Sequence, residues 1–203
     1  MKEEQFYHML AQHVPTVSID YCYRLRQRYR FHFKLSKSRK TKLGDYRFDP
    51  STKSHTISVN YDLNPYSFLI TYIHEVAHLV VREVYGNNSA PHGKEWKRTF
   101  KELFSPLLND SVFPQKILVP LVKYLRNPKA SSYADGALLM ALHTYDDKDN
   151  QANFLHQLES GRIFRIGSRV FKKGNTRRTR VLCLEPKTGR KYLISKMAEV
   201  EPL

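Results

Sequence analysis

Cysteine, long apolar runs and acidic residues are all scarce in this chain of 203 residues. Its two cysteines, Cys22 and Cys183, are too few for a disulfide framework, so we expect a reducing compartment. No apolar run approaches the roughly 18 residues of a membrane-spanning helix. Residues 1–4 lead into an amphipathic segment rather than an apolar signal sequence. We therefore expect a cytoplasmic protein without a membrane partner, associated with the nucleoid if its source is bacterial.

The shortage of acidic residues points to a polyanionic partner. Lys and Arg number 34 against 19 Asp and Glu, which gives a net charge of +15 and a pI near 9.8. The excess is concentrated in Arg24–Lys42, where Tyr23, Tyr29 and Phe31 interleave the charges, and in residues 161–203. The alternative for the first segment is a solvated face, and for the second an idle cap. The predicted contacts to DNA, without sequence specificity, are Arg28, Arg30, Lys37, Arg39, Lys40, Lys172, Lys173, Arg177, Arg178 and Arg180.

A metal-binding pattern lies near the middle of the chain, on a segment predicted to be a buried helix. His74, Glu75 and His78 form the pattern H-E-x-x-H, with the two histidines one helical turn apart. Asn64-Pro65 is typical of a helix start, and apolar residues cover most of the helix surface as far as Tyr85. Burying two imidazoles and a carboxylate is costly unless a metal ion pairs with them, so we predict a divalent metal there.

A catalytic zinc site usually has three protein ligands and one open position, so a third ligand must follow downstream. The candidates are Glu83, His92, Glu95 and Glu102. We choose His92, because a turn-rich loop over residues 86–91 lets a second helix fold back towards the first. Pro91 is expected to open that second helix, with His92 in its first turn. Glu95 remains the second choice, and the predicted cofactor is one Zn²⁺.

The metal pattern and its surroundings resemble the SprT/Spartan (SprT-like) zinc metalloproteases. His-Glu-Val-Ala-His is followed after thirteen residues by His92-Gly93 and then by Trp96 and Phe100. Upstream, Lys42–Tyr46 and Ile57–Asn60 resemble the paired strands that precede the metal helix in that family. The resemblance covers about residues 15–105.

This resemblance implies a zincin-like fold, zinc at His74, His78 and His92, and Glu75 as the general base. It also implies proteolysis of DNA-bound proteins. The chain departs from the family in one respect, since many bacterial members end in a four-cysteine zinc ribbon that two cysteines cannot form.

We predict an α+β fold with three parts. Residues 1–105 form a zincin-like metalloprotease domain with a small antiparallel sheet, 106–160 a helical extension packed on it, and 161–203 a small basic all-β module that replaces the ribbon without metal. Strands at 29–37, 42–48 and 55–61 are expected to form an antiparallel meander, and His55–Asn60 an edge strand that pairs with an extended peptide. Helices are predicted at 3–13, 16–28, 115–126 and 132–145, and C-terminal strands at 168–172, 176–184 and 190–194.

The predicted function is zinc-dependent proteolysis of DNA-bound or crosslinked proteins by a monomer. Glu75 would take a proton from a metal-activated water and return it to the leaving amine. The pattern does not identify a second electrophile, for which a Tyr or an Arg remains open. The alternative function is a nucleic-acid-binding regulatory protein whose zinc site is structural or inactive. A metallopeptidase of free peptides is a third, but it would leave the basic segments unexplained.

Overall fold

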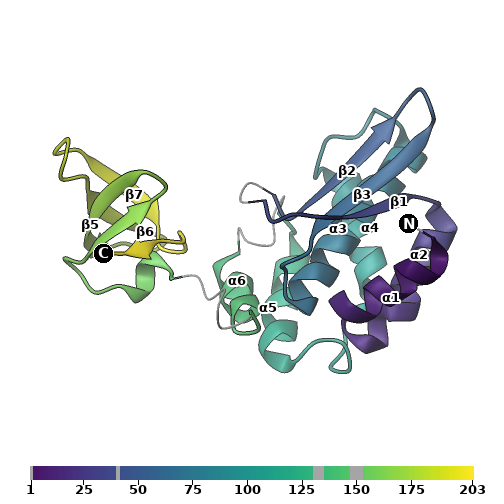
Figure 1. The fold of residues 1–203 in the computed structure, drawn as a ribbon, viewed down its shortest axis with the longest axis horizontal. Coiled ribbons are helices and arrows are strands. Elements are labelled where there is room, and N and C mark those ends of the chain that lie inside the picture. The colour runs from purple at the N-terminus through teal and green to yellow at the C-terminus, as the bar shows by residue number, and fades with distance from the viewer. Residues whose placement is uncertain (1, 40–41, 130–134, 147–152) are drawn as a thin grey trace. The chain divides into compact units, whose positions relative to one another are not determined.

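The computed structural model describes residues 2–39, 42–129, 135–146 and 153–203 (Figure 1). The chain divides into two compact units, Met1–Asp146 and Asp147–Leu203, each with its own hydrophobic core. The boundary between them lies earlier than the predicted 160/161. Leu155 packs in the C-terminal core and Phe154 pairs with Glu199, so the residues just before 161 belong with the C-terminal unit.

Two helices of 11 residues each open the N-terminal unit. Helix α1 spans Glu3–His13, as predicted, and buries Phe6, Met9 and Leu10. The helix predicted from residue 16 is a short 3₁₀ turn, Thr16–Ser18, followed by α2, Ile19–Tyr29. Arg30 ends α2 in the left-handed conformation, with φ at 46°.

Three strands follow, in an order that corrects the predicted meander. They are β1 (His32–Ser36), β2 (Gly44–Asp49) and β3 (Ser54–Asn60), and β3 lies between the other two. Strand β1 pairs with β3 in parallel and β2 pairs with it antiparallel. The parallel register sets Phe33 beside Ile57, so alternating apolar residues of both strands enter one core. Because β3 is central, the prediction that His55–Asn60 is an edge strand is wrong; the edges are β1 and β2.

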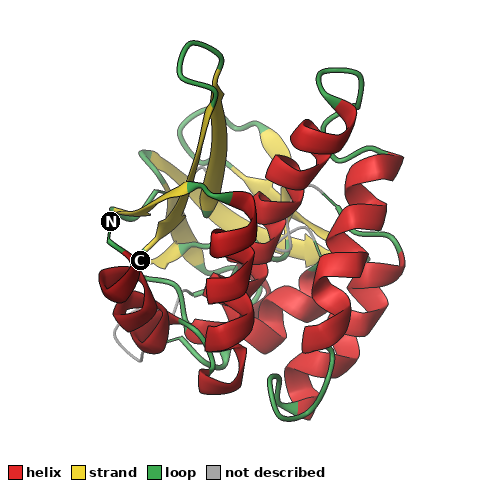
Figure 2. Cartoon of the chain, turned by 90° about the vertical axis from the view of Figure 1, so that its right-hand side faces the viewer, coloured by secondary structure: helices red, strands yellow, loops and turns green. Residues whose placement is uncertain are grey.

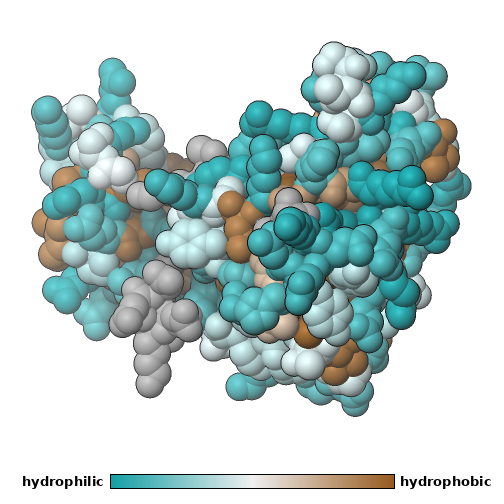
Figure 3. All heavy atoms as spheres, turned by 45° about the vertical axis from the view of Figure 1, so that its right-hand side comes forward, coloured by the Kyte–Doolittle hydropathy of each residue, from teal (hydrophilic) through white to brown (hydrophobic). Residues whose placement is uncertain are grey.

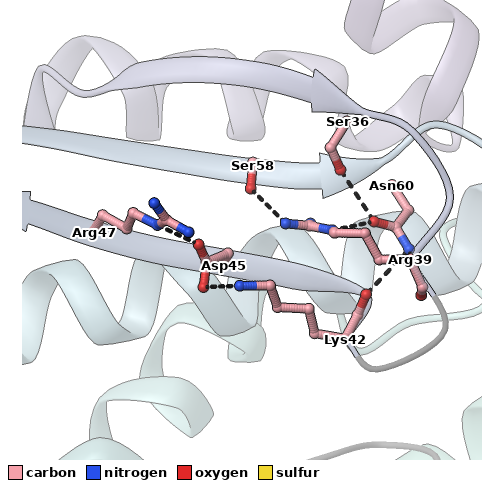
Figure 4. A network of polar contacts seen from close by, with 7 residues as sticks. All are labelled: Ser36, Arg39, Lys42, Asp45, Arg47, Ser58 and Asn60. Atoms are coloured by element: carbon pink, nitrogen blue, oxygen red, sulfur yellow. Dashed lines mark hydrogen bonds and ion pairs between the residues drawn. The ribbon is translucent and has the colours of Figure 1, made fainter.

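One buried asparagine fixes the connection from β1 to β2. Oδ1 of Asn60 accepts hydrogen bonds from Ser36 and from Nε of Arg39, and its Nδ2 donates to the carbonyls of Arg39 and Lys42 (Figure 4). Nη1 of Arg39 also donates to Ser58, at 3.3 Å. A parallel pair needs its chain carried back across the sheet, and Asn60 pairs with the carbonyls of Arg39 and Lys42 in that connection.

The metal-pattern helix has the predicted bounds. Helix α3 spans Pro65–Tyr85; Oδ1 of Asn64 accepts from the backbone N–H groups of Tyr66 and Ser67, and Gly86 ends the helix. Its inner face packs against the sheet, and the β2–β3 hairpin projects beyond the helices (Figures 1 and 2). Among the described helices, none is long and apolar enough to cross a membrane.

Three more helices complete the N-terminal unit and share its core. They are α4 (Lys94–Phe104), α5 (Gln115–Arg126), which has the predicted bounds, and α6 (Gly136–His143). Asn64 ties α6 to the start of α3, since its Nδ2 donates to the carbonyl of Leu142 at 3.0 Å. The first residues of the helix predicted at 132–145 lie outside the described residues. His143 is hydrogen-bonded to Asp146 and is not a metal ligand candidate.

The C-terminal unit contains five antiparallel strands. They are β4 (Ile163–Ile166), β5 (Arg169–Thr176), β6 (Arg180–Leu184), β7 (Lys191–Ser195) and β8 (Glu201–Pro202), in the order β7-β6-β5-β4-β8. Gly174 and Asn175, predicted to be a turn, lie inside β5 at an irregularity of the β5–β6 pairing. A Cβ on Gly174 would be 2.4 Å from the carbonyl oxygen of Leu182, so only glycine fits this close approach.

Candidate metal centre

Three imidazoles meet at one point in the N-terminal unit. The Nε2 atoms of His74, His78 and His92 lie 3.0–3.1 Å from one another, and these residues form the one metal-compatible cluster among the described residues. A tetrahedral zinc ion with bonds of about 2.05 Å separates its ligand atoms by about 3.3 Å. The three nitrogens therefore have a spacing close to that of one face of a zinc tetrahedron.

His92 reaches this point from a loop, not from a helix. Helix α4 begins at Lys94, so the prediction that Pro91 opens it is wrong. A turn closed by the bond from Gly93 N–H to the carbonyl of Ala90 precedes α4 and sets His92 in the left-handed region, at a φ of 56°. The tight turn points the His92 ring back at α3. A histidine in the first turn of a helix would not need this left-handed backbone conformation.

The rejected ligand candidates all lie outside the cluster. Glu95, the second choice, is 3.7 Å from Lys94 and does not join the three histidines. Glu83 lies 3.7 Å from Nε2 of His55, and Glu102 lies 3.9 Å from Arg98. The donor set is therefore three imidazole nitrogens, and no other described His, Cys, Asp or Glu joins it.

Burial keeps these imidazoles neutral. Desolvation lowers the pKa of His74 well below its ordinary value and the pKa of His78 to about 4, and proximity of the other histidines adds to both shifts. Desolvation lowers the pKa of His92 as well. Because a metal binds the neutral imidazole, no proton has to be removed from this site at neutral pH before binding.

Trp96 closes one side of the cluster. Its ring centroid lies 4.6 Å from that of His74 and 4.7 Å from that of His92, and only 1% of its surface is exposed. Its indole Nε1 is buried without a hydrogen-bond partner among the described residues. A buried donor left unpaired beside the cluster fits a centre that takes an additional oxygen ligand. The residues present therefore fit a zinc ion.

Glu75 lies at the free edge of strand β2. Asn60 N–H donates to the carbonyl of Leu43, so alternate residues of β2 bond to β3, and Gly44, Tyr46 and Phe48 turn their backbone groups away from it. The backbone N–H of Tyr46 on that free edge favours the ionised form of the Glu75 carboxylate and so opposes the rise of its pKa. The carboxylate thus sits where β2 faces away from its own sheet.

Gly44 makes room for this carboxylate. A Cβ at Gly44 would lie 2.5 Å from Oε1 of Glu75 and 2.7 Å from a methyl of Thr71. Glu75 itself is 7% exposed, and burial, with a smaller contribution from Asp45, raises its pKa to about 8. A divalent cation at the neighbouring histidines would favour the ionised form and lower that pKa.

Tyr46 is a site residue that the sequence did not single out. Its ring lies parallel to that of His78, and its hydroxyl is 2.9 Å from Nδ1 of His55. It was contained only in the predicted strand at 42–48 and in the Lys42–Tyr46 stretch of the family resemblance. Its position depends on the β2–β3 register, which no local pattern specifies.

Most of the predicted DNA contacts are exposed, but three are not available as predicted. Lys173 is 6% exposed, and its ammonium donates to the carbonyls of His156 and Leu158. Arg39 is half-buried and bonded to Asn60 and Ser58, and Lys40 lies outside the described residues. The exposed ones are Arg28, Arg30, Lys37, Lys172, Arg177, Arg178 and Arg180. Hydrophilic side chains cover most of the surface visible in Figure 3.

The three interleaved aromatics lie beside arginines in two grooves. Phe31 is buried, and the hydroxyl of Tyr23 donates to Glu3. Tyr29 lines a groove of about 820 Å³ together with Arg24 and Arg28. A second groove, of about 740 Å³, is lined by Tyr23 and Phe31 together with Arg26 and Arg30, so the aromatic–arginine combination occurs in both grooves.

Comparison with known proteins gives one match. Residues 7–113 match the family model of the SprT-like family. No curated protein and no solved structure matches the chain. The match covers the sheet, α3 and α4, and it includes all three clustered histidines and Glu75.

Proposed function

This chain belongs to the SprT-like family, and on that premise we propose that it is a zinc-dependent metalloendopeptidase that hydrolyses DNA-bound or crosslinked proteins. The observation that carries the proposal is the meeting of three neutral imidazoles beside a buried carboxylate at a free strand edge. Such a site combines metal ligands, a base and a place for an extended peptide.

The metal would be held by His74, His78 and His92. When bound, zinc supplies Lewis-acid chemistry, which polarises a peptide carbonyl and lowers the pKa of water. Trp96 would exclude bulk water from one side of the ligands, since it is almost fully buried against them.

Glu75 would act as the general base. Its carboxylate takes a proton from the attacking water and then returns it to the leaving amide nitrogen. The space above Gly44, beside the backbone of Tyr46, would hold the carboxylate, so the base is oriented before substrate arrives.

The peptide would lie along β2. The backbone groups of Gly44 and Phe48 point to the free edge, where an extended chain can add as a further strand. This replaces the predicted pairing with β3, whose two edges are occupied. Pairing through main-chain groups gives affinity without demanding a particular sequence.

DNA binding is the second part of the proposal, and exposed cations support it. Lys172, Arg177, Arg178 and Arg180 would contact phosphates from the C-terminal unit, and Arg28 from the groove on the N-terminal unit. Binding of this kind would bring DNA-bound proteins to the enzyme and would show little base preference.

The alternative is a nucleic-acid-binding regulator with a structural or inactive zinc. A structural site usually takes four protein ligands, whereas the cluster among the described residues has three. A structural site also has no use for a buried carboxylate beside it. These two features favour the enzyme.

The test is cleavage of a protein crosslinked to DNA by the zinc-loaded full chain. We expect fragments when zinc is present and none after chelation, and faster cleavage of the crosslinked protein than of the same protein free in solution. Cleavage of the crosslinked and the free protein at equal rates would favour a metallopeptidase that acts independently of DNA. Zinc binding with no cleavage of any substrate would favour the regulator.

A further inference from the structure

A row of side chains runs from the metal ligand His78 across the β2–β3 hairpin. The ring of Tyr46 lies parallel to that of His78, with 5° between their planes and 6.4 Å between centroids. The Tyr46 hydroxyl is 2.9 Å from Nδ1 of His55, and these two rings are 17° from parallel. Phe48 contacts His55 and lies beneath Arg82, whose guanidinium is 4.4 Å from the Phe48 centroid.

This row begins and ends on the same face of α3. Arg82 follows His78 by one helical turn, so the three hairpin rings bridge two successive turns of the helix. Tyr46 and Phe48 point to the same side of β2, and His55 is paired with Phe48 on β3. The row therefore connects the hairpin to the metal helix at the level of one ligand.

The hydroxyl of Tyr46 holds its ring in this row. Glu83 lies 3.7 Å from Nε2 of His55, which favours a proton on Nε2 and leaves Nδ1 as the acceptor. The Tyr46 hydroxyl then donates to Nδ1. Without this hydrogen bond the Tyr46 ring would keep its neighbours, but nothing polar would fix its rotation.

From this geometry we propose that Tyr46 is a positioning residue for the metal ligand His78, and that its hydrogen bond to His55 keeps it in place. Outside the three-histidine cluster, the ring contacts of His78 among the described residues are with Tyr46 and Trp96. Neighbours that orient a metal ligand typically change metal affinity by 10–100-fold when they are removed. The inference rests on zinc binding at the proposed centre.

The fluorescence of Trp96 can be used to follow zinc binding. Trp96 is the one tryptophan in the sequence, and its ring contacts all three histidines. Its fluorescence should therefore change when zinc binds, and competition with a chelator converts that change into an affinity. No substrate is needed, so the readout is independent of proteolysis.

The experiment compares zinc affinities of the full chain and of Tyr46→Phe, His55→Phe and the double variant. We expect each single change to weaken zinc binding about tenfold and the double variant to be no weaker than either, because both remove one hydrogen bond. Tyr66→Phe is the matched control. This change removes the hydroxyl of Tyr66, a half-buried tyrosine on α3 that packs on Phe113 and Tyr145. It should leave zinc affinity unchanged.

Two results would overturn the inference while leaving the proposed function intact. Single variants that bind zinc as tightly as the wild type would show that Tyr46 does not position His78. Effects that multiply to about a hundredfold in the double variant would show that the two residues act separately. A wild-type chain that binds no zinc would overturn the proposed function itself and this inference with it, which separates the two failures.

Discussion

The two units differ most in where they keep their charged and polar side chains. In the N-terminal unit, Glu75, Asn60 and the three histidines are held in fixed positions, and even Arg39 is bonded to the sheet. Residues 147–203 contain thirteen Lys or Arg against six Asp or Glu, and most of the described ones are exposed. The N-terminal unit thus holds a few polar groups in fixed positions besides exposed cations such as Arg28 and Arg30, whereas most described cations of the C-terminal unit are exposed.

This difference predicts two kinds of response to mutation. A catalytic group that must be held in one geometry loses its function when a neighbouring residue displaces it. Single substitutions near the three histidines should therefore have large effects on activity. Exposed cations contribute to binding separately, so their removal should act in small, additive steps that depend on salt.

The largest effect is expected from Gly44→Ala. The new methyl would overlap Oε1 of Glu75 and displace the carboxylate, so turnover should fall by about 10²–10⁴-fold, as expected for loss of a general base. Zinc content should be unchanged, which metal analysis checks. Gly174→Ala is the matched control. It creates a similar clash with Leu182 in the other unit and should leave turnover on a protein free of DNA intact.

His92→Ala should abolish tight zinc binding. Two imidazoles remain in the cluster. Losing a direct ligand should lower zinc affinity by more than the roughly 100-fold that loss of a group supporting a ligand can cause. Elemental analysis after dialysis measures this. Glu95→Ala is the control, since Glu95 is paired with Lys94 and lies outside the cluster. Zinc retained in His92→Ala and absent from Glu95→Ala would reverse the assignment of the third ligand.

Removing exposed arginines from the C-terminal unit should act gradually. In the double variant Arg177→Gln/Arg178→Gln, the slope of log affinity for DNA against log salt should flatten by about 0.9 for each phosphate that the protein no longer neutralises. Zinc content should not change. A salt-dependent binding series on duplex DNA measures the slope. If the slope equals that of the wild type, these arginines do not contact phosphates.

The smallest effect is expected from Lys173→Met. The substitution removes an ammonium that donates to the carbonyls of His156 and Leu158, and leaving these half-buried acceptors unpaired should cost at most about 1–3 kcal/mol. Denaturant unfolding of the full chain should show this destabilisation in the C-terminal unit. DNA affinity should stay at the wild-type value under folding conditions. A large fall in DNA affinity would mean that Lys173 is accessible after all.

Local patterns were sufficient for the metal helix. Asn64-Pro65 at its start and Gly86 at its end set the bounds of α3, and the spacing of His74 and His78 follows directly from helical geometry. The third histidine of the cluster, His92, was also predicted from the sequence, because the turn-rich loop at 86–91 lets the next helix fold back towards α3. The turn that places it was not, since a left-handed histidine carries no local signal.

The order of strands could not be predicted in the same way. Alternating residues in β1, β2 and β3 identify strands but do not say which pair, and a parallel β1–β3 pair depends on residues far apart in sequence. That order moved the free edge from β3 to β2. It also brought Gly44 and Tyr46 to Glu75, so the part of the site that depends on pairing appeared only in the structure.

The most direct test of the central claim is turnover by Glu75→Gln. Zinc-loaded wild-type chain and variant should be compared on one protein substrate at equal metal content. Glutamine cannot take a proton, yet it keeps the size of the side chain, so we expect full zinc occupancy and a fall in turnover of about 10²–10⁴-fold. Turnover equal to that of the wild type would contradict Glu75 as the base, and with it the account of the site.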